Sequence, residues 1–166
     1  MGQFHLPQTI TDGERRSWIE EIAAAPRQMR AAVAGLSDSQ LDTPYRPEGW
    51  TVRQVVHHVP DSHINAVIRM KFALTENQPT IKPYHEALWA ELPDAKTPVE
   101  PSLALLEALH ARWTILLERM TDEQWKRTFL HPDLGVRNMD QSLGLYAWHG
   151  RHHIAHVTRL RERMAW

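Results

Sequence analysis

The residues best suited to chemistry are histidines, and four of them lie close together near the end of the chain. The sequence has 11 histidines, and its segment 146–156 reads YAWHGRHHIAH. If that segment is helical, two histidine pairs are four residues apart, His149 with His153 and His152 with His156. Side chains at that spacing lie one above the other, about 5–6 Å apart at Cβ. Either pair can therefore bind one metal ion at about 2.0–2.1 Å.

A catalytic zinc site typically has three protein ligands and one open position, so a third ligand is expected from another segment. The best candidate is His58, which follows His57 in a second segment with helical periodicity. Asp61 is at helical spacing from His58, and its carboxylate could orient an imidazole or act as a general base. The spacing predicts a histidine-lined inner face, but it does not choose between the two pairs.

Buried histidines also have a purely structural interpretation, in which hydrogen bonds rather than a metal satisfy the ring nitrogens. An HxxxH pair alone is a weak signal, and because it is not HExxH, a metalloprotease of that class is disfavoured. His63 is interpreted as a polar core residue. The histidines without a partner at ligand spacing are interpreted as surface or packing residues: His5, His85, His110 and His131.

Four long segments must position these histidines, because their apolar residues recur at three- and four-residue steps typical of helices. Asp12 is expected to cap the first helix, and Thr51 with Gln54 forms a capping box for the second. The third is expected to begin with a capping box at Thr97 and with Pro98 at its first helical position. The four segments are residues 12–34, 51–74, 97–120 and 140–164.

The connections between these segments indicate the architecture. A long connection, residues 75–98, contains four prolines and separates the second and third helices. Such a connection crosses the end of a bundle or covers a site. Residues 128–138 are expected to form a loop or a small hairpin, and strands otherwise have almost no support. We therefore expect an all-α four-helix bundle in one domain, residues 1–166.

Composition excludes several classes of partner and site. With 19 basic and 20 acidic residues, the net charge is -1, which gives no electrostatic reason to expect nucleic acid or an anionic membrane. The absence of cysteine excludes disulfides, thiolate ligands and a cysteine nucleophile from the chain. Neither a signal peptide nor a run of 18 apolar residues is visible, so a cytoplasmic protein is expected.

Two motifs resemble those of a known family. The segment WTVRQVVHHV, in which His58 follows Trp50 by eight residues, resembles the second-helix motif of DinB-like proteins. The segment WHGRHHIAH, residues 148–156, resembles their fourth-helix motif and is most similar to the YfiT-like branch. In most of the family Arg-Gly-Gln follows the histidine pair, whereas Ile154, Ala155 and His156 follow it here, as in that branch.

The resemblance implies a bundle with an up-down-down-up course and a metal held by His58, His149 and His153. Zinc is the default ion and nickel is the alternative. The branch includes metal-dependent hydrolases and bacillithiol S-transferases, and its members are mostly dimeric. The resemblance therefore implies a homodimeric enzyme with a small-molecule substrate.

Three functions remain open at this stage. A metal with three histidine ligands can lower the pKa of a bound water and make a hydrolase. It can instead bind a low-molecular-weight thiol and transfer it to an electrophile, and the absence of cysteine fits this reaction because the nucleophile would arrive with the cosubstrate. The third function is a metal- or ligand-binding bundle without catalysis.

Overall fold

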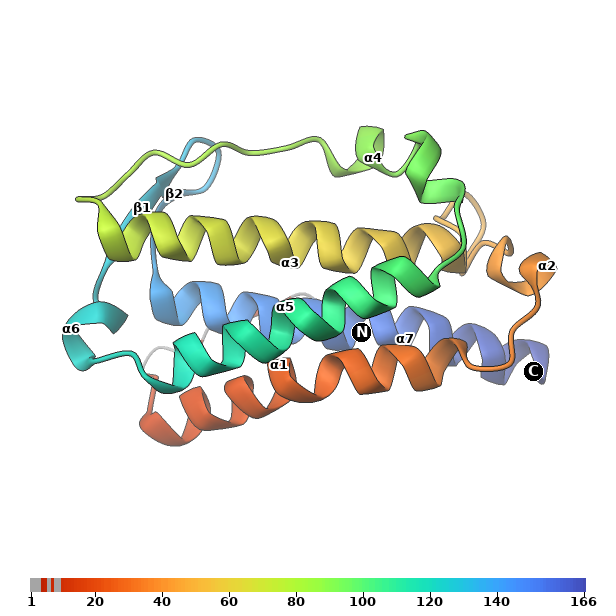
Figure 1. Cartoon of the computed structure of the whole chain (residues 1–166), viewed down its shortest axis with the longest axis horizontal. Helices are drawn as coiled ribbons and strands as arrows, with labels where there is room; N and C mark the ends of the chain where they lie inside the picture. Colours follow the sequence, from red (N-terminus) through yellow and green to blue (C-terminus); the bar gives the residue numbers. More distant parts are fainter. Residues whose placement is uncertain (1–3, 6, 8–9) are drawn as a thin grey trace.

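The computed structural model describes residues 4–5, 7 and 10–166. Within them, α1 and α7 run in one direction and α3 and α5 in the other, so the course is up-down-down-up (Figure 1). The expected four-helix bundle is therefore confirmed. The long helices are α1 (Asp12–Val33), α3 (Val52–Thr75), α5 (Glu100–Glu118) and α7 (Met139–Met164).

Side chains that cap backbone N–H groups begin three of these helices. Thr51 accepts a hydrogen bond from the Gln54 N–H, as predicted, and Asn138 caps α7 in the same way. The expectation for α1 was wrong by one residue. Thr11 is the cap, because its hydroxyl accepts from the N–H of Glu14, which leaves Asp12 in the first turn.

The predicted start of α5 at Thr97 was also wrong. The helix begins at Glu100, and no side chain caps it. The Thr97 hydroxyl donates instead to the carbonyl of Asp94, at 2.7 Å. Thr97 therefore belongs to the connection that precedes α5.

That connection, residues 76–99, returns along α3 to the end where α5 begins (Figure 1). Because α3 and α5 run in the same direction, the chain must travel the length of the bundle between them. The connection contains the short helices α4 (Glu86–Trp89) and η1 (Pro93–Lys96). Arg53 of α3 donates to the Thr97 carbonyl at 3.2 Å, which holds the end of the connection in place.

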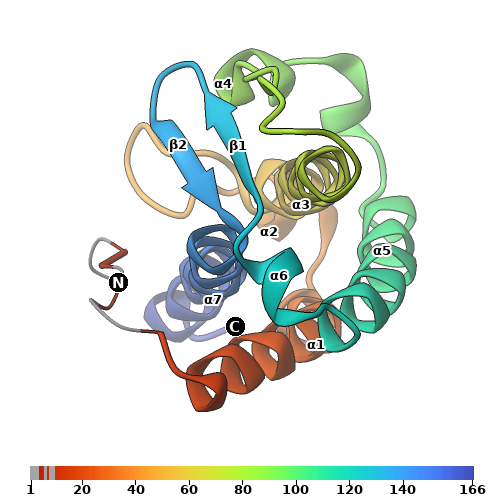
Figure 2. The same cartoon turned by 90° about the vertical axis from the view of Figure 1, so that its left-hand side faces the viewer.

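The remaining elements are short. Helices α2 (Asp38–Leu41) and α6 (Asp122–Trp125) join the long ones, and β1 (Thr128–His131) pairs antiparallel with β2 (Gly135–Asn138). Of the two alternatives for residues 128–138, the hairpin is therefore the observed one. It lies beside the beginning of α7 and the end of α3 (Figure 2).

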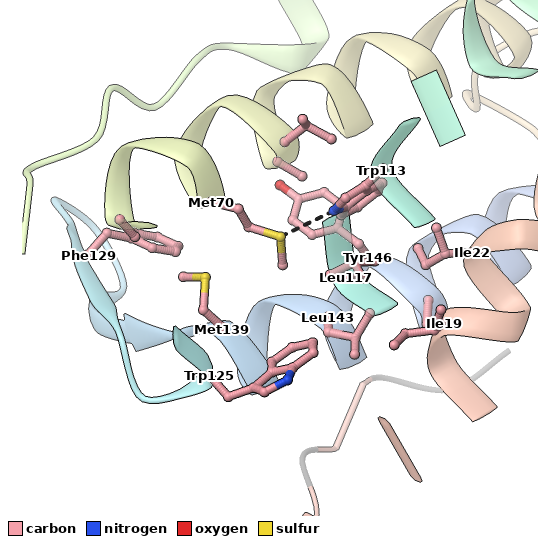
Figure 3. Close-up of a cluster of buried hydrophobic side chains, with 14 of the residues drawn as sticks. Ile19, Ile22, Met70, Trp113, Leu117, Trp125, Phe129, Met139, Leu143 and Tyr146 are labelled. Atoms are coloured by element: carbon pink, nitrogen blue, oxygen red, sulfur yellow. Dashed lines mark hydrogen bonds between the residues drawn. The ribbon is translucent and has the colours of Figure 1, made fainter. Parts of the chain in front are cut away.

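The core has two parts. One contains Trp113 and Met70, and the Trp113 indole N–H contacts the Met70 sulfur at 3.3 Å (Figure 3). The other contains Met29, Leu106 and Val157. The histidines of α7, and His63 of α3, fall between the residues of these two parts, whereas His57 and His58 lie among valines of the second part. The helices that carry the candidate ligands are thus fixed by apolar packing on both sides of them.

No helix among the described residues has the length and apolar character needed to cross a membrane. Residues 1–3, where the expectation about a signal peptide begins, lie outside the described residues.

Candidate metal centre

Three histidines from two helices converge on one point. His58 lies in α3, and His149 and His153 lie one turn apart in α7. The Nε2 atom of His149 is 3.2 Å from Nε2 of His58 and 3.1 Å from Nε2 of His153. Among the described residues this is the one group of three whose ligand atoms all lie within 4.8 Å of one another. The structure thus brings together the three predicted ligands.

The geometry of the three nitrogens fits a metal ion. In a tetrahedral site with bonds of about 2.0–2.1 Å, neighbouring ligand atoms are separated by about 3.3–3.4 Å. The two measured Nε2–Nε2 distances, 3.2 and 3.1 Å, are close to that value. A neutral ring nitrogen either carries one proton or offers one lone pair, so His149 Nε2 can form a hydrogen bond with only one of its two neighbours. A metal ion would satisfy all three nitrogens at once.

A second set of buried histidines fixes the orientation of His149. Its Nδ1 atom is 3.1 Å from His63 Nε2, and His63 Nδ1 is 2.8 Å from His110 Nε2. The series ends where His110 Nδ1 lies 2.6 Å from the carbonyl oxygen of Ile22. These residues come from α7, α3, α5 and α1 in turn, so the series crosses the whole bundle.

The end of this series determines where its protons lie. A carbonyl oxygen can only accept, so His110 Nδ1 carries a proton and His110 Nε2 accepts. His63 must then donate from Nδ1 and accept at Nε2, and His149 must donate from Nδ1. The lone pair of His149 is therefore on Nε2, the atom that faces His58 and His153. This is the arrangement a metal-binding imidazole needs, with its other nitrogen donating to a partner.

Burial keeps the imidazoles of the three candidate ligands neutral. It lowers the pKa of His58 to about 4. Burial and, after it, the neighbouring histidines lower the pKa of His149 and of His153 well below the ordinary value. Metal binding requires a neutral imidazole, so at neutral pH these rings need not lose a proton first.

The alternative pair does not belong to the group of three, although His152 lines the same cavity. His152 and His156 are 2.9 Å apart between their Nε2 atoms, and the ring of His156 stacks on Tyr45 at 4.0 Å between centroids. Within the described part of the chain no third histidine or carboxylate completes a group with them. A hydrogen bond between the two rings and the stacking on Tyr45 account for their positions.

The role suggested for Asp61 has no support in the described contacts. Its carboxylate forms no hydrogen bond with a histidine among the described residues, and it does not line the cavity next to the three ligands. Burial, and secondarily the charge of Asp94, raise the pKa of Asp61 to about 6. A neighbouring histidine, His63, orients the ligand His149 instead.

The other histidines have separate places. His57 bonds to the Ser102 hydroxyl at 2.7 Å and to the Thr97 carbonyl at 3.0 Å, so it joins α3 to α5 and the connection. His63 is a polar core residue, as predicted, and His110 is a buried packing residue that also bonds to it. His5 and His85 are exposed, whereas His131 lines the cavity next to the ligands.

A cavity of about 480 Å³ opens onto the three ligand histidines. Its walls include Trp50 and Trp148, and the Trp50 ring lies 4.6 Å from the His58 ring between centroids. Trp50 packs against the core beside the start of α3, and it also forms part of the site. Burial raises the pKa of Tyr84 to about 12, so its phenol remains a hydrogen-bond donor in the cavity.

Sequence reasoning missed several residues of this cavity. Ser62 and Arg69 follow His58 by four and eleven residues, which places all three on one face of α3. Tyr146 precedes His149 by three residues on α7. Helical spacing from the ligands could have found these side chains. It could not have found the cavity residues that the connection and the hairpin contribute: Pro83, Tyr84, Glu86, His131, Asp133 and Leu134.

Comparison with known proteins gives consistent matches over the whole chain. The model of the DinB superfamily matches residues 21–157. A Bacillus cereus (strain AH820) protein named "Putative metal-dependent hydrolase" is 55% identical over 166 residues, which is 100% of this chain and 96% of that protein. A Bacillus anthracis (strain A0248) protein of the same name has the same identity and coverage.

Two solved structures have the same fold. YfiT from Bacillus subtilis, described as a probable metal-dependent hydrolase with an unusual four-helix bundle topology, matches with a TM-score of 0.97 and 50% identity. The match covers 100% of this chain and 96% of YfiT. TT2238, a four-helix bundle protein, matches with a TM-score of 0.59 and 21% identity. That match covers 85% of this chain and 95% of the TT2238 chain, and at this identity it shows the fold alone. Together with the family model, these full-length likenesses show that the chain belongs to the DinB superfamily.

Proposed function

We propose that the protein is a metal-dependent hydrolase of a small molecule, with one divalent ion held by His58, His149 and His153. The observation that carries the proposal is the convergence of three neutral imidazoles at the wall of a cavity of about 480 Å³. No fourth ligand belongs to the group among the described residues, so one coordination position would face the cavity. The names of the relatives support the same reaction class.

When bound, such an ion acts as a Lewis acid that lowers the pKa of water and polarises a carbonyl. The protein's own residues have three tasks around it. His63 and His110 hold the lone pair of His149 toward the ion. Trp50 and Trp148 form apolar walls that restrict water at one side. The carboxylates of Glu86 and Asp133 line the cavity and are the groups able to accept a proton from a nucleophile.

A thiol S-transferase is the second candidate. The chain has no cysteine, so a thiol nucleophile would have to be a cosubstrate, and the cavity is large enough for a small molecule next to the ligands. Zinc is our first choice of ion, and nickel is the second. The homodimer implied by the family resemblance stays a prediction, which light scattering on the purified protein tests.

The two reactions are separated by assaying the metal-loaded protein on panels of small esters and amides, and on a thiol with monochlorobimane. Hydrolysis that is lost in His149→Ala and retained in His156→Ala supports the proposal. Conjugation of the thiol without hydrolysis assigns the protein to the transferases instead. A loaded protein inactive in both assays, with a fourth protein ligand visible by X-ray absorption, would indicate a structural metal.

A further inference from the structure

Arg69 of α3 lies in the cavity next to His58, His149 and His153, and it has no carboxylate partner there among the described residues. It lines that cavity and also a neighbouring, mainly apolar cavity of about 350 Å³. One terminal nitrogen donates to the Tyr146 hydroxyl at 3.4 Å, and the other donates to the Lys82 carbonyl at 3.0 Å. Its Nε atom is buried and has no hydrogen-bond partner. Among the described residues, Arg69 forms no ion pair.

Two other shielded arginines are neutralised by carboxylates, whereas the half-buried Arg127 and Arg161 donate to backbone carbonyls. Arg53 pairs with Asp42 at 2.6 Å and with Asp38 at 2.8 Å. Arg15 pairs with Asp140 at 2.6 Å. A partly buried guanidinium without an anion is costly, because its charge has lost water and gained no opposite charge. Arg69 differs from these because it lines the cavity next to the three histidines and is the one arginine, among the described residues, with a buried nitrogen that lacks a partner.

The surroundings of Arg69 favour a ligand rather than a protein anion. Tyr84 lies under the guanidinium, 5.9 Å from its carbon to the ring centroid, and Tyr146 contacts it from α7. Glu86 and Asp133 line the same cavity, yet neither forms an ion pair with Arg69. The ring of Tyr146 is 6.0 Å from that of the ligand His149 between centroids. One small molecule can thus contact both the guanidinium and the metal position.

We propose that Arg69 binds a carboxylate of the substrate, while the reacting end of that molecule lies at His58, His149 and His153. The planar guanidinium presents parallel N–H groups that match the two oxygens of a carboxylate. The Tyr146 hydroxyl, which accepts from Arg69, still has its own proton to donate, and Tyr84 lines the same cavity. This inference rests on the proposed function, because it assumes a metal at the three histidines. It adds the substrate class, a small carboxylate-bearing molecule.

The test uses cobalt(II)-loaded protein and simple thiols as probes, since a thiolate bound to cobalt gives a charge-transfer band. Mercaptoalkanoic acids of three to eight carbons are compared with mercaptoalkanols of the same length, so that metal and chain contributions cancel within each pair. A charge-assisted hydrogen bond predicts that the acid binds about 10- to 100-fold more tightly at the best length. A mercaptoalkanesulfonate of that length distinguishes a planar carboxylate from a tetrahedral anion.

The variant Arg69→Gln removes the charge, and the matched control is Arg137→Gln, because Arg137 lines only the apolar cavity. The preference for the acid should fall to within about 2-fold in Arg69→Gln and persist in the control. Arg69→Lys keeps the charge but loses the paired N–H groups, and it should retain only part of the preference. It serves as the test if Arg69→Gln fails to fold.

The outcomes separate the two proposals. If the wild type takes up no cobalt, the metal function fails and this inference fails with it. Bound cobalt that gives no charge-transfer band with any thiol overturns the role of Arg69 alone. A band with equal affinity for acid and alcohol at every length overturns the role of Arg69 alone. A full preference for the acid in both Arg69 variants also overturns this role. So does tighter binding of the sulfonate than of the carboxylate in the wild type.

Discussion

Replacing His63 with leucine removes the middle member of the series that links the ligand His149 to the Ile22 carbonyl. The His149 Nδ1–H and His110 Nε2 then lose their partners in a fully buried position, where His63 itself has 0% exposure. Each unpaired buried group costs about 1–3 kcal/mol, so the free energy of unfolding should fall by about 2–6 kcal/mol. Because the lone pair of His149 is no longer held on Nε2, metal affinity should fall about 10- to 100-fold.

The assay is the metal dissociation constant, measured by competition with a chromophoric chelator at pH 7. His63→Gln is the conservative variant, because an amide oxygen can accept from His149 while the amide N–H₂ donates to His110. It should recover part of the affinity. His57→Leu is the control for general destabilisation, since His57 is also a buried, doubly hydrogen-bonded histidine of α3 but has no bond to the ligands. If His63→Leu folds and binds metal as tightly as the wild type, the inferred proton arrangement is wrong.

Three further predictions concern stability. His57→Leu should lower the free energy of unfolding by about 1–3 kcal/mol in urea denaturation, because the Ser102 hydroxyl loses its partner and the Thr97 carbonyl loses one of its two donors, while metal content stays at the wild-type level. Burial raises the pKa of Asp61 to about 6, above the ordinary value of 3.8. The folded protein therefore binds this proton more tightly than the unfolded chain does, and the free energy of unfolding decreases as the pH rises from 3.8 to about 6. At pH 7 the free energy of unfolding of Asp61→Asn should therefore exceed that of the wild type by about 1 kcal/mol, after allowance for solvent screening. At pH 3.5 the two should be equally stable, and an equal stabilisation at both pH values would exclude this cause. Gly150→Ala should raise the free energy of unfolding by up to about 1 kcal/mol, since the new Cβ would meet its nearest neighbour at an ordinary 3.5 Å. Gly144→Ala should lower the free energy of unfolding, because its Cβ would lie 3.0 Å from a tryptophan ring. Matched thermal melts of the two alanine variants check this order.

Much of the fold could be predicted because apolar periodicity and capping boxes are local. The pair Thr51 with Gln54 forms the predicted cap in the structure. The capping rule failed at Thr97, where the same residue types are present but the chain takes another course. There the threonine hydroxyl bonds backwards to Asp94, and its carbonyl receives Arg53 and His57 from α3. Such long-range bonds leave no trace in the local pattern.

The candidate site could be predicted only in part, for a related reason. Helical spacing identified both histidine pairs of α7, but the approach of α3 decides which of them meets His58. The resemblance to DinB-like proteins supplied that register. The place of His110 was not predictable from spacing, because its partners, His63 and the Ile22 carbonyl, lie on other helices. Tyr84 reaches the cavity from a connection whose course depends on the whole bundle.

The central claim is that His58, His149 and His153 together hold one metal ion, and elemental analysis of purified variants tests it most directly. Each variant is reconstituted with zinc, desalted and measured for metal per chain, with circular dichroism as the check of folding. We expect His58→Ala, His149→Ala and His153→Ala to lose the ion while His152→Ala and His156→Ala retain it in full. Full retention by folded His149→Ala and His153→Ala, or loss in His152→Ala and His156→Ala instead, would contradict the account.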